Sequence, residues 1–123
     1  MTSRSDWSAI SRWFDDLVQL QVIRRAVGGR PIGGLAAQLA ETDELARKAL
    51  AAGFDRWEKP LRVGLETMRS KGKLRRSADP ARLATATLAA IQGGLVLSQT
   101  RRDPQQLRLA LDGAYAYLRS FAT

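Results

Sequence analysis

Apolar residues recur every three or four positions along almost the whole chain. This spacing places side chains on one side of an α-helix. No segment sustains the two-residue alternation that is typical of a half-buried β-strand. The chain has 123 residues, which fits one domain and suffices for a core without disulfides or metals. The sequence therefore predicts a single all-α domain over residues 1–123, a bundle of about five helices.

Glycine, proline and capping residues divide this helical pattern into segments. Gly28 ends a first helix over about residues 7–27, and a short helix over residues 35–40 follows a glycine-rich loop. Thr42 is expected to cap a long third helix, because threonine side chains accept hydrogen bonds from free amides at helix N-termini. Pro60 falls inside this helix and should kink it.

Two Asp-Pro pairs mark the beginnings of the last two helices. Asp79 and Asp103 each place a capping carboxylate before a proline, and proline suits the first position of a helix. The expected helices run over about residues 80–100 and 104–121.

The helix expected over residues 80–100 is apolar on almost every side and rich in alanine and glycine. A helix that is apolar all round must be covered all round, and small residues let helices approach closely. Two interpretations are open. Either a second copy of the chain, related by a two-fold axis, covers the helix, or the helix is the buried centre of the monomer.

The absence of cysteine and histidine excludes several function classes. Without them the chain has no disulfide framework, no thiolate nucleophile, no Ser-His-Asp triad and no common zinc site. Neither catalysis nor a metal or other cofactor is predicted. No stretch approaches the roughly twenty apolar residues that span a bilayer, and the N-terminus lacks the apolar core of a signal peptide. A cytoplasmic protein without membrane contact is expected.

The formal charge of +8 raises the question of an acidic partner. The basic residues are scattered, and their densest run is KGKLRR at residues 71–76. A solvated loop is the preferred interpretation of this run, and a phosphate-binding patch is the alternative. Direct electrostatic binding of nucleic acid stays open on the net charge alone.

Several short motifs follow one another in a familiar order: GRPIGGLA at residues 29–36, FDRWE at 54–58, GKL at 72–74, and the stretch from ADP at 78–80 through QGGL at 92–95 to RRDP at 101–104. In this order and spacing the chain resembles the C-terminal ligand-sensing and dimerisation domain of TetR-family transcriptional regulators. The resemblance covers about residues 10–121.

The resemblance implies a homodimer in which the last two helices of each subunit form a four-helix bundle. The residues expected in this interface are Leu83, Thr87, Ala90, Gly94, Leu97, Leu107, Leu111, Ala114, Tyr115 and Leu118.

The resemblance also implies that the upstream helices enclose a pocket for a small apolar effector. Aromatic and large apolar residues at helical spacing are the candidate walls, although ordinary core is the preferred interpretation of any one of them taken singly. These candidates are Trp13, Phe14, Leu17, Phe54, Trp57, Leu61, Met68, Ile91 and Leu95. Effector binding would shift the helices and release operator DNA from N-terminal DNA-reading heads.

The chain departs from the family pattern at its beginning. TetR regulators carry a helix-turn-helix head before this region, whereas only residues 1–8 precede the resemblance here. The chain is therefore expected to contact operator DNA only through a head that it does not contain. The alternative is a stand-alone, head-less helical protein that heterodimerises with a full-length regulator. Arg30 stands where some relatives sense electrophiles with a cysteine, so thiol-based sensing is excluded.

Overall fold

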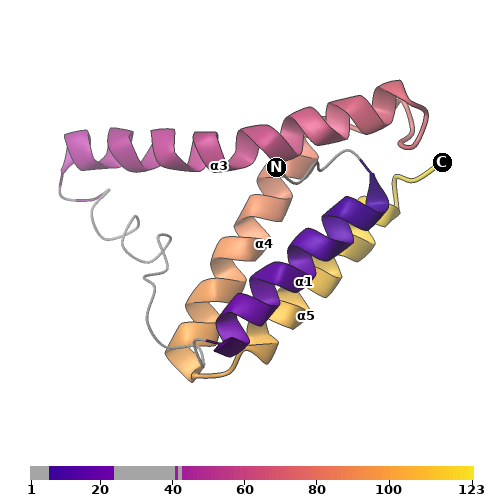
Figure 1. Cartoon of the computed structure of the whole chain (residues 1–123). Coiled ribbons are helices and arrows are strands. Elements are labelled where there is room, and N and C mark those ends of the chain that lie inside the picture. Colours follow the sequence, from indigo (N-terminus) through magenta and orange to yellow (C-terminus); the bar gives the residue numbers. More distant parts are fainter. Residues whose placement is uncertain (1–5, 24–40, 42) are drawn as a thin grey trace.

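The computed structural model describes residues 6–23, 41 and 43–123 of the chain. Within these ranges it contains helices and no strand, and the only β-type pairing described is an isolated bridge between Leu74 and Ala122. The predicted all-α class is confirmed. The helices, drawn in Figure 1, are α1 (Trp7–Ile23), α3 (Glu44–Ser70), α4 (Pro80–Arg101) and α5 (Gln105–Arg119).

Two expected features lie outside the described residues. These are the last turn of the first helix, at residues 24–27, and the short helix over residues 35–40. The described ranges therefore hold four of the expected helices.

The N-caps of the helices follow the predicted chemistry, with one correction. The side chain that caps α3 is that of Asp43, not Thr42: its Oδ1 accepts hydrogen bonds from the amides of Leu45 and Ala46, at 3.0 and 3.2 Å. Aspartate caps at least as well as threonine, and here it stands directly before the first helical residue.

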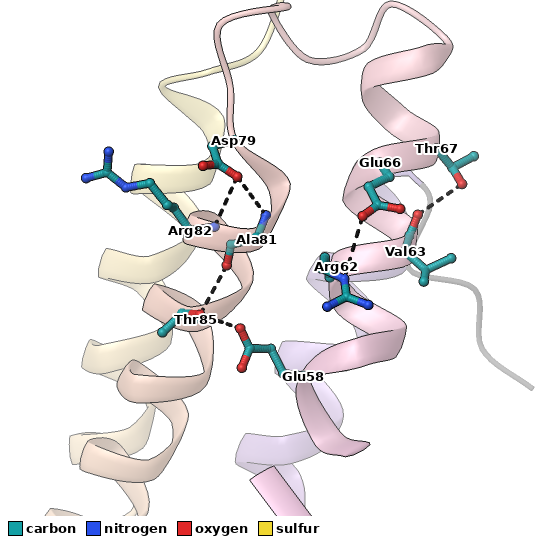
Figure 2. Close-up of polar contacts among 9 residues, drawn as sticks. All are labelled: Glu58, Arg62, Val63, Glu66, Thr67, Asp79, Ala81, Arg82 and Thr85. Atoms are coloured by element: carbon teal, nitrogen blue, oxygen red, sulfur yellow. Dashed lines mark hydrogen bonds and ion pairs between the residues drawn. The ribbon is translucent and has the colours of Figure 1, made fainter. Parts of the chain in front are cut away.

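The two Asp-Pro signals are confirmed as helix starts. Asp79 Oδ1 accepts from the amides of Ala81 and Arg82 at the beginning of α4, as Figure 2 shows. Asp103 Oδ1 accepts from the amide of Gln105 at 3.0 Å, so α5 begins one residue later than expected but uses the predicted carboxylate.

The helices pack around one core, and the first helix lies against the last. In Figure 1, α4 and α5 lie side by side, α3 crosses the beginning of α4, and α1 lies along α5. The buried apolar side chains of this core are Ile10, Phe14 and Val18 of α1, Leu61, Leu65 and Met68 of α3, Leu74 and Ala78 of the loop, Leu83, Ala84 and Ile91 of α4, and Leu107, Leu111 and Leu118 of α5.

The contact between α4 and α5 is close enough to require glycine. A Cβ atom at Gly94 would lie 2.8 Å from Leu107 Cδ1, 3.0 Å from Ala110 Cβ and 3.1 Å from Leu107 Cα. The last of these is a backbone atom, which a rotamer change cannot move away. The expectation that small residues in this helix allow close packing therefore holds at Gly94.

Two hydrogen bonds to Ser98, which is fully buried, stabilise the turn between α4 and α5. Its hydroxyl accepts a hydrogen bond from the amide of Leu107 at 2.9 Å, and its carbonyl accepts from the amide of Asp103 at 2.9 Å. Because the first amides of a helix have no partner within the helix, Ser98 acts as a cap for α5 from the preceding helix.

A hydroxyl and an ion pair connect the remaining helices. Thr85 Oγ1 of α4 donates to the carboxylate of Glu58 in α3, the one contact between the two helices drawn in Figure 2. Arg108 of α5 pairs with Asp15 of α1 at 2.7 Å and with Asp112 at 3.3 Å. The hydrogen bond to Asp15 raises the pKa of Arg108 and outweighs the opposing effect of burial.

One side of the apolar helix α4 is buried within the single chain, and the other side is exposed. Six residues expected in a dimer interface are buried within the single chain, on the inner faces of α4 and α5: Leu83, Thr87, Gly94, Leu107, Leu111 and Leu118. The uncovered side of α4 carries Ala86, Ala89, Gly93 and Leu97.

By length and composition alone α4 could cross a membrane, contrary to the sequence expectation. This is weak evidence, because the core helix of a soluble protein passes the same test.

Replacing Gly94 by alanine should destabilise the chain by about 1–3 kcal/mol, because the added methyl group meets the α5 backbone. Gly53→Ala in α3 is the matched control. The nearest atom to a Cβ there is the Arg56 Nη2 at 3.8 Å, an ordinary contact, so alanine should stabilise the helix by roughly 0.5–1 kcal/mol. Urea denaturation at one chain concentration measures both, and equal effects of the two substitutions would refute the close contact.

Candidate functional site

A small cavity lies where α1 and α3 come near each other without packing closely. Its volume is about 210 Å³. Helix α1 lines it with Trp13 and Leu17, and α3 lines it with Arg56, Trp57 and Pro60. The walls are two indoles, an isobutyl group and a pyrrolidine ring, with one guanidinium among them. Such a surface favours a small, mainly apolar molecule that carries a polar or anionic group.

Helical spacing brings these side chains to one place. Trp13 and Leu17 are one turn apart on α1, and Trp57 and Pro60 are almost one turn apart on α3. The ring of Trp13 is supported from behind by Phe14, with ring centroids 5.5 Å apart, and Phe14 belongs to the core. One wall of the cavity therefore rests on rigid packing.

Helix α3 changes character at Pro60, across which it stays continuous. The predicted apolar stripe along this helix is buried only beyond the proline, at Leu61, Leu65 and Met68. Before it the stripe is open: Leu50 and Phe54 are partly buried, and Trp57 is 43% exposed. The first half of α3 thus presents an apolar face that the described core does not cover.

The structure divides the nine predicted pocket residues into three groups. Trp13, Leu17 and Trp57 line the cavity together. Phe54 and Leu95 are partly buried and do not line it. The remaining residues belong to the buried core: Phe14, Leu61, Met68 and Ile91.

Sequence reasoning did not select three residues that matter here. Arg56 and Pro60 line the cavity. Arg56 directly precedes Trp57 and Pro60 follows it by three residues, and this closeness to a predicted pocket residue could have indicated both. Gln21 of α1 is only 3% exposed, and its Oε1 has no hydrogen-bond partner in the described part of the chain. It lies one turn beyond Leu17, so its spacing could have shown that it shares the inward face.

The expected interface residues that are not fully buried lie on different surfaces. Leu97 is exposed, and Ala90 and Ala114 are partly buried. Tyr115 faces α1, because its ring lies 6.0 Å from that of Trp7 and 6.3 Å from that of Phe14. On α5 the exposed small and apolar positions are Leu109, Gly113, Ala116 and Tyr117.

No acid–base or metal chemistry is built at this cavity. Arg56 is the only charged residue that lines it, and no cluster of three or more potential metal-ligating side chains occurs in the part of the chain that the structure describes. The size and the mainly apolar walls of this cavity are those of a site for a small molecule, not of a catalytic centre.

The described part of the chain is thus all-α, with a small, mainly apolar cavity between α1 and α3. Residues 7–112 match the family described as the C-terminal domain of LmrA/YxaF-like transcriptional regulators. The chain belongs to this family, which is a branch of the TetR regulators, and the predicted resemblance is confirmed. Comparison with curated proteins and with solved structures gave no match.

Replacing Gln21 by leucine should stabilise the protein by about 1 kcal/mol, because it removes a buried acceptor that lacks a partner. A domain of this size should gain roughly 4 °C in melting temperature. Gln19→Leu, on the exposed side of the same helix, is the control and should change little. A lower melting temperature for Gln21→Leu would mean that the carboxamide is satisfied.

Proposed function

We propose that the chain is the effector-sensing and dimerisation domain of a TetR-family transcriptional repressor. The observation that carries the proposal is the family match over residues 7–112, together with the cavity between α1 and α3. The effector is small and mainly apolar, binds without a cofactor, and reaches the domain in the cytoplasm. Operator DNA is read by an N-terminal head that these residues do not include, and no catalytic step is involved.

The effector binds between Trp13 and Leu17 of α1 and Trp57 and Pro60 of α3. Arg56 offers a guanidinium to a polar or anionic substituent at the edge of the cavity. An effector shifts the helices only if it binds one arrangement better than the other. The first half of α3 supports such a shift, because its apolar stripe is not buried by the described core, so few described core contacts oppose its movement.

The second copy of the chain covers the outer faces of α4 and α5. The buried faces of both helices are already occupied by the monomer, so the partner packs on the stripes that remain outside. These are Ala86, Ala89, Gly93 and Leu97 on α4, and Leu109, Gly113, Ala116 and Tyr117 on α5. The α4 stripe repeats at intervals of three and four residues, and the α5 positions stand four, seven and eight residues after the first, so each set shares one helix face.

Helix α1 couples the cavity to the rest of the domain. It supplies Trp13 and Leu17 to the cavity, and its Asp15 holds Arg108 of the dimerisation helix α5 at 2.7 Å. A displacement of α1 on effector binding would therefore be transmitted to α5 and to whatever precedes Trp7. In a dimer this changes the separation of two DNA-reading heads and weakens operator binding.

Light scattering behind a sizing column should give twice the 13.5 kDa of one chain at micromolar concentration. The double substitution Leu97→Glu and Leu109→Glu should yield a folded monomer, since it places carboxylates on the outer faces of α4 and α5. Leu45→Glu changes a more exposed leucine on α3, outside both faces, and should stay dimeric. A monomeric wild type would remove the dimerisation part of the proposal.

A neutral apolar fluorophore, N-phenyl-1-naphthylamine, should bind with increased emission and be excited by energy transfer from tryptophan. Trp57→Ala should weaken its binding by about tenfold, the usual cost of removing an aromatic anchor. Val63→Ala alters an exposed apolar residue of α3 outside the cavity and serves as the control. Equal affinity in both variants would place the probe elsewhere.

A further inference from the structure

One end of the bundle gathers basic side chains from four separate segments. Two hollows of about 590 and 580 Å³ adjoin there and share Thr123 in their walls. Cations from α1, α3, the α3–α4 loop and α5 line them, and Asp6 is the only acidic side chain that does so. With the adjacent Lys71, these cations form what we term the basic end: Arg12, Arg69, Lys71, Lys73, Arg75, Arg76 and Arg119.

The loop that carries most of this charge is held in place. Leu74, in the middle of the basic run, is 1% exposed and belongs to the core. On either side of it the backbone is bonded to the C-terminal segment: the amide of Arg75 donates to the carbonyl of Phe121 at 2.9 Å, and the amide of Thr123 donates to that of Lys73 at 3.3 Å. Thr123 Oγ1 also donates to the carbonyl of Gly72 at 2.7 Å.

The fixed backbone keeps Lys73, Arg75 and Arg76 displayed at the surface while Leu74 anchors the loop. The run at residues 71–76 is therefore an anchored basic surface. A partner that binds it does not have to order the loop first, which lowers the entropic cost of binding.

The ion pairs of the described residues do not involve the cations of the basic end. Among the described residues the ion pairs join Arg47 to Glu44, Arg62 to Glu66 and Arg108 to Asp15 and Asp112, and none of these cations belongs to the basic end.

The nearest acidic side chain already has a structural task. Asp6 Oδ1 accepts a hydrogen bond from the amide of Ala9 at 2.7 Å at the start of α1. Arg119 lies over the ring of Trp7, 4.6 Å from its centroid, and Arg69 donates to the carbonyl of Ala78 at 3.0 Å. These contacts orient two guanidinium groups and leave their positive charge uncompensated.

We propose that the basic end binds the phosphate backbone of duplex nucleic acid without sequence preference. The cations are exposed or partly exposed, so no enclosed site exists in which a single small anion would lose its water. A polyanion gains instead from the release of condensed counterions by several cations at once. Arginine predominates, and its planar guanidinium binds phosphate oxygens in pairs.

A membrane surface fits the basic end less well. Interfacial binding needs apolar side chains that insert beside the cations. None of the exposed large apolar residues of the described chain lines either hollow, and Leu74 faces the core. This proposal does not depend on effector binding or on dimerisation.

The test is fluorescence anisotropy of a labelled duplex of arbitrary sequence, titrated with the wild-type chain at several salt concentrations below 200 mM. We expect micromolar binding at the lowest salt concentration, and a slope of log K against log salt concentration between about −4 and −6 if most of these cations contact phosphates. The absence of binding at the lowest salt concentration overturns the proposal.

Two triple variants distinguish binding of the duplex by the basic end from attraction of the duplex by the net charge of the chain. Lys71→Gln, Arg75→Gln and Arg76→Gln together should weaken binding at least tenfold and reduce the magnitude of the salt slope by about 3. The control variant removes the same charge elsewhere, through exposed Lys48→Gln, Lys59→Gln and Arg101→Gln. It should keep most of the affinity. Circular dichroism melts check that both variants fold.

Two results would overturn the assignment. Equal losses in the two triple variants would mean that net charge, and not the basic end, attracts the duplex. Binding to vesicles of phosphatidylserine and phosphatidylcholine that is tighter than duplex binding, and is lost in the first variant only, would assign the basic end to an anionic membrane.

Discussion

The close approach of α4 to α5 at Gly94 determines how the rest of the domain is arranged. A side chain there would separate the two backbones, so glycine allows Leu107, Leu111 and Leu118 to enter the core against the inner face of α4. It also brings the start of α5 within reach of the Ser98 hydroxyl, which caps it. The inner faces of both helices are buried within one chain. A second copy of the chain could therefore pack only on the small and apolar residues of their outer faces.

Helices α1 and α3, in contrast to α4 and α5, leave a cavity between them. Helix α3 enters the core only after Pro60, and its first half keeps an apolar stripe open beside Trp13 and Leu17 of α1. An open apolar face costs free energy unless something covers it some of the time. The described chain therefore combines a tightly packed pair, α4 and α5, with a pair that leaves a cavity between its helices, α1 and α3.

The sequence predicted the class, the helix order and the starts of the last two helices, because capping chemistry is local and Asp79 and Asp103 carry it alone. It could not predict the rotation of α4 about its axis. Nearly every position of that helix is apolar, so Leu83 and Leu97 looked alike, although only Leu83 faces the core. The same limit applies to the cavity: Phe14 and Trp13 are neighbours in sequence, and only the packing of α1 on α5 decides which becomes core.

Helix α1 borders the basic end, lines the cavity and contacts α5. Its first turn borders the basic end at Trp7, its middle supplies Trp13 and Leu17 to the cavity, and Asp15 between them holds Arg108 of α5. A rigid helix cannot move at one of these places alone. A domain that precedes Trp7 would join the chain beside the basic end, so a nucleic acid held by it would lie near the cations of residues 71–76. Effector binding at the middle of α1 would then alter two contacts with nucleic acid at once, the spacing of the heads and the position of the basic end.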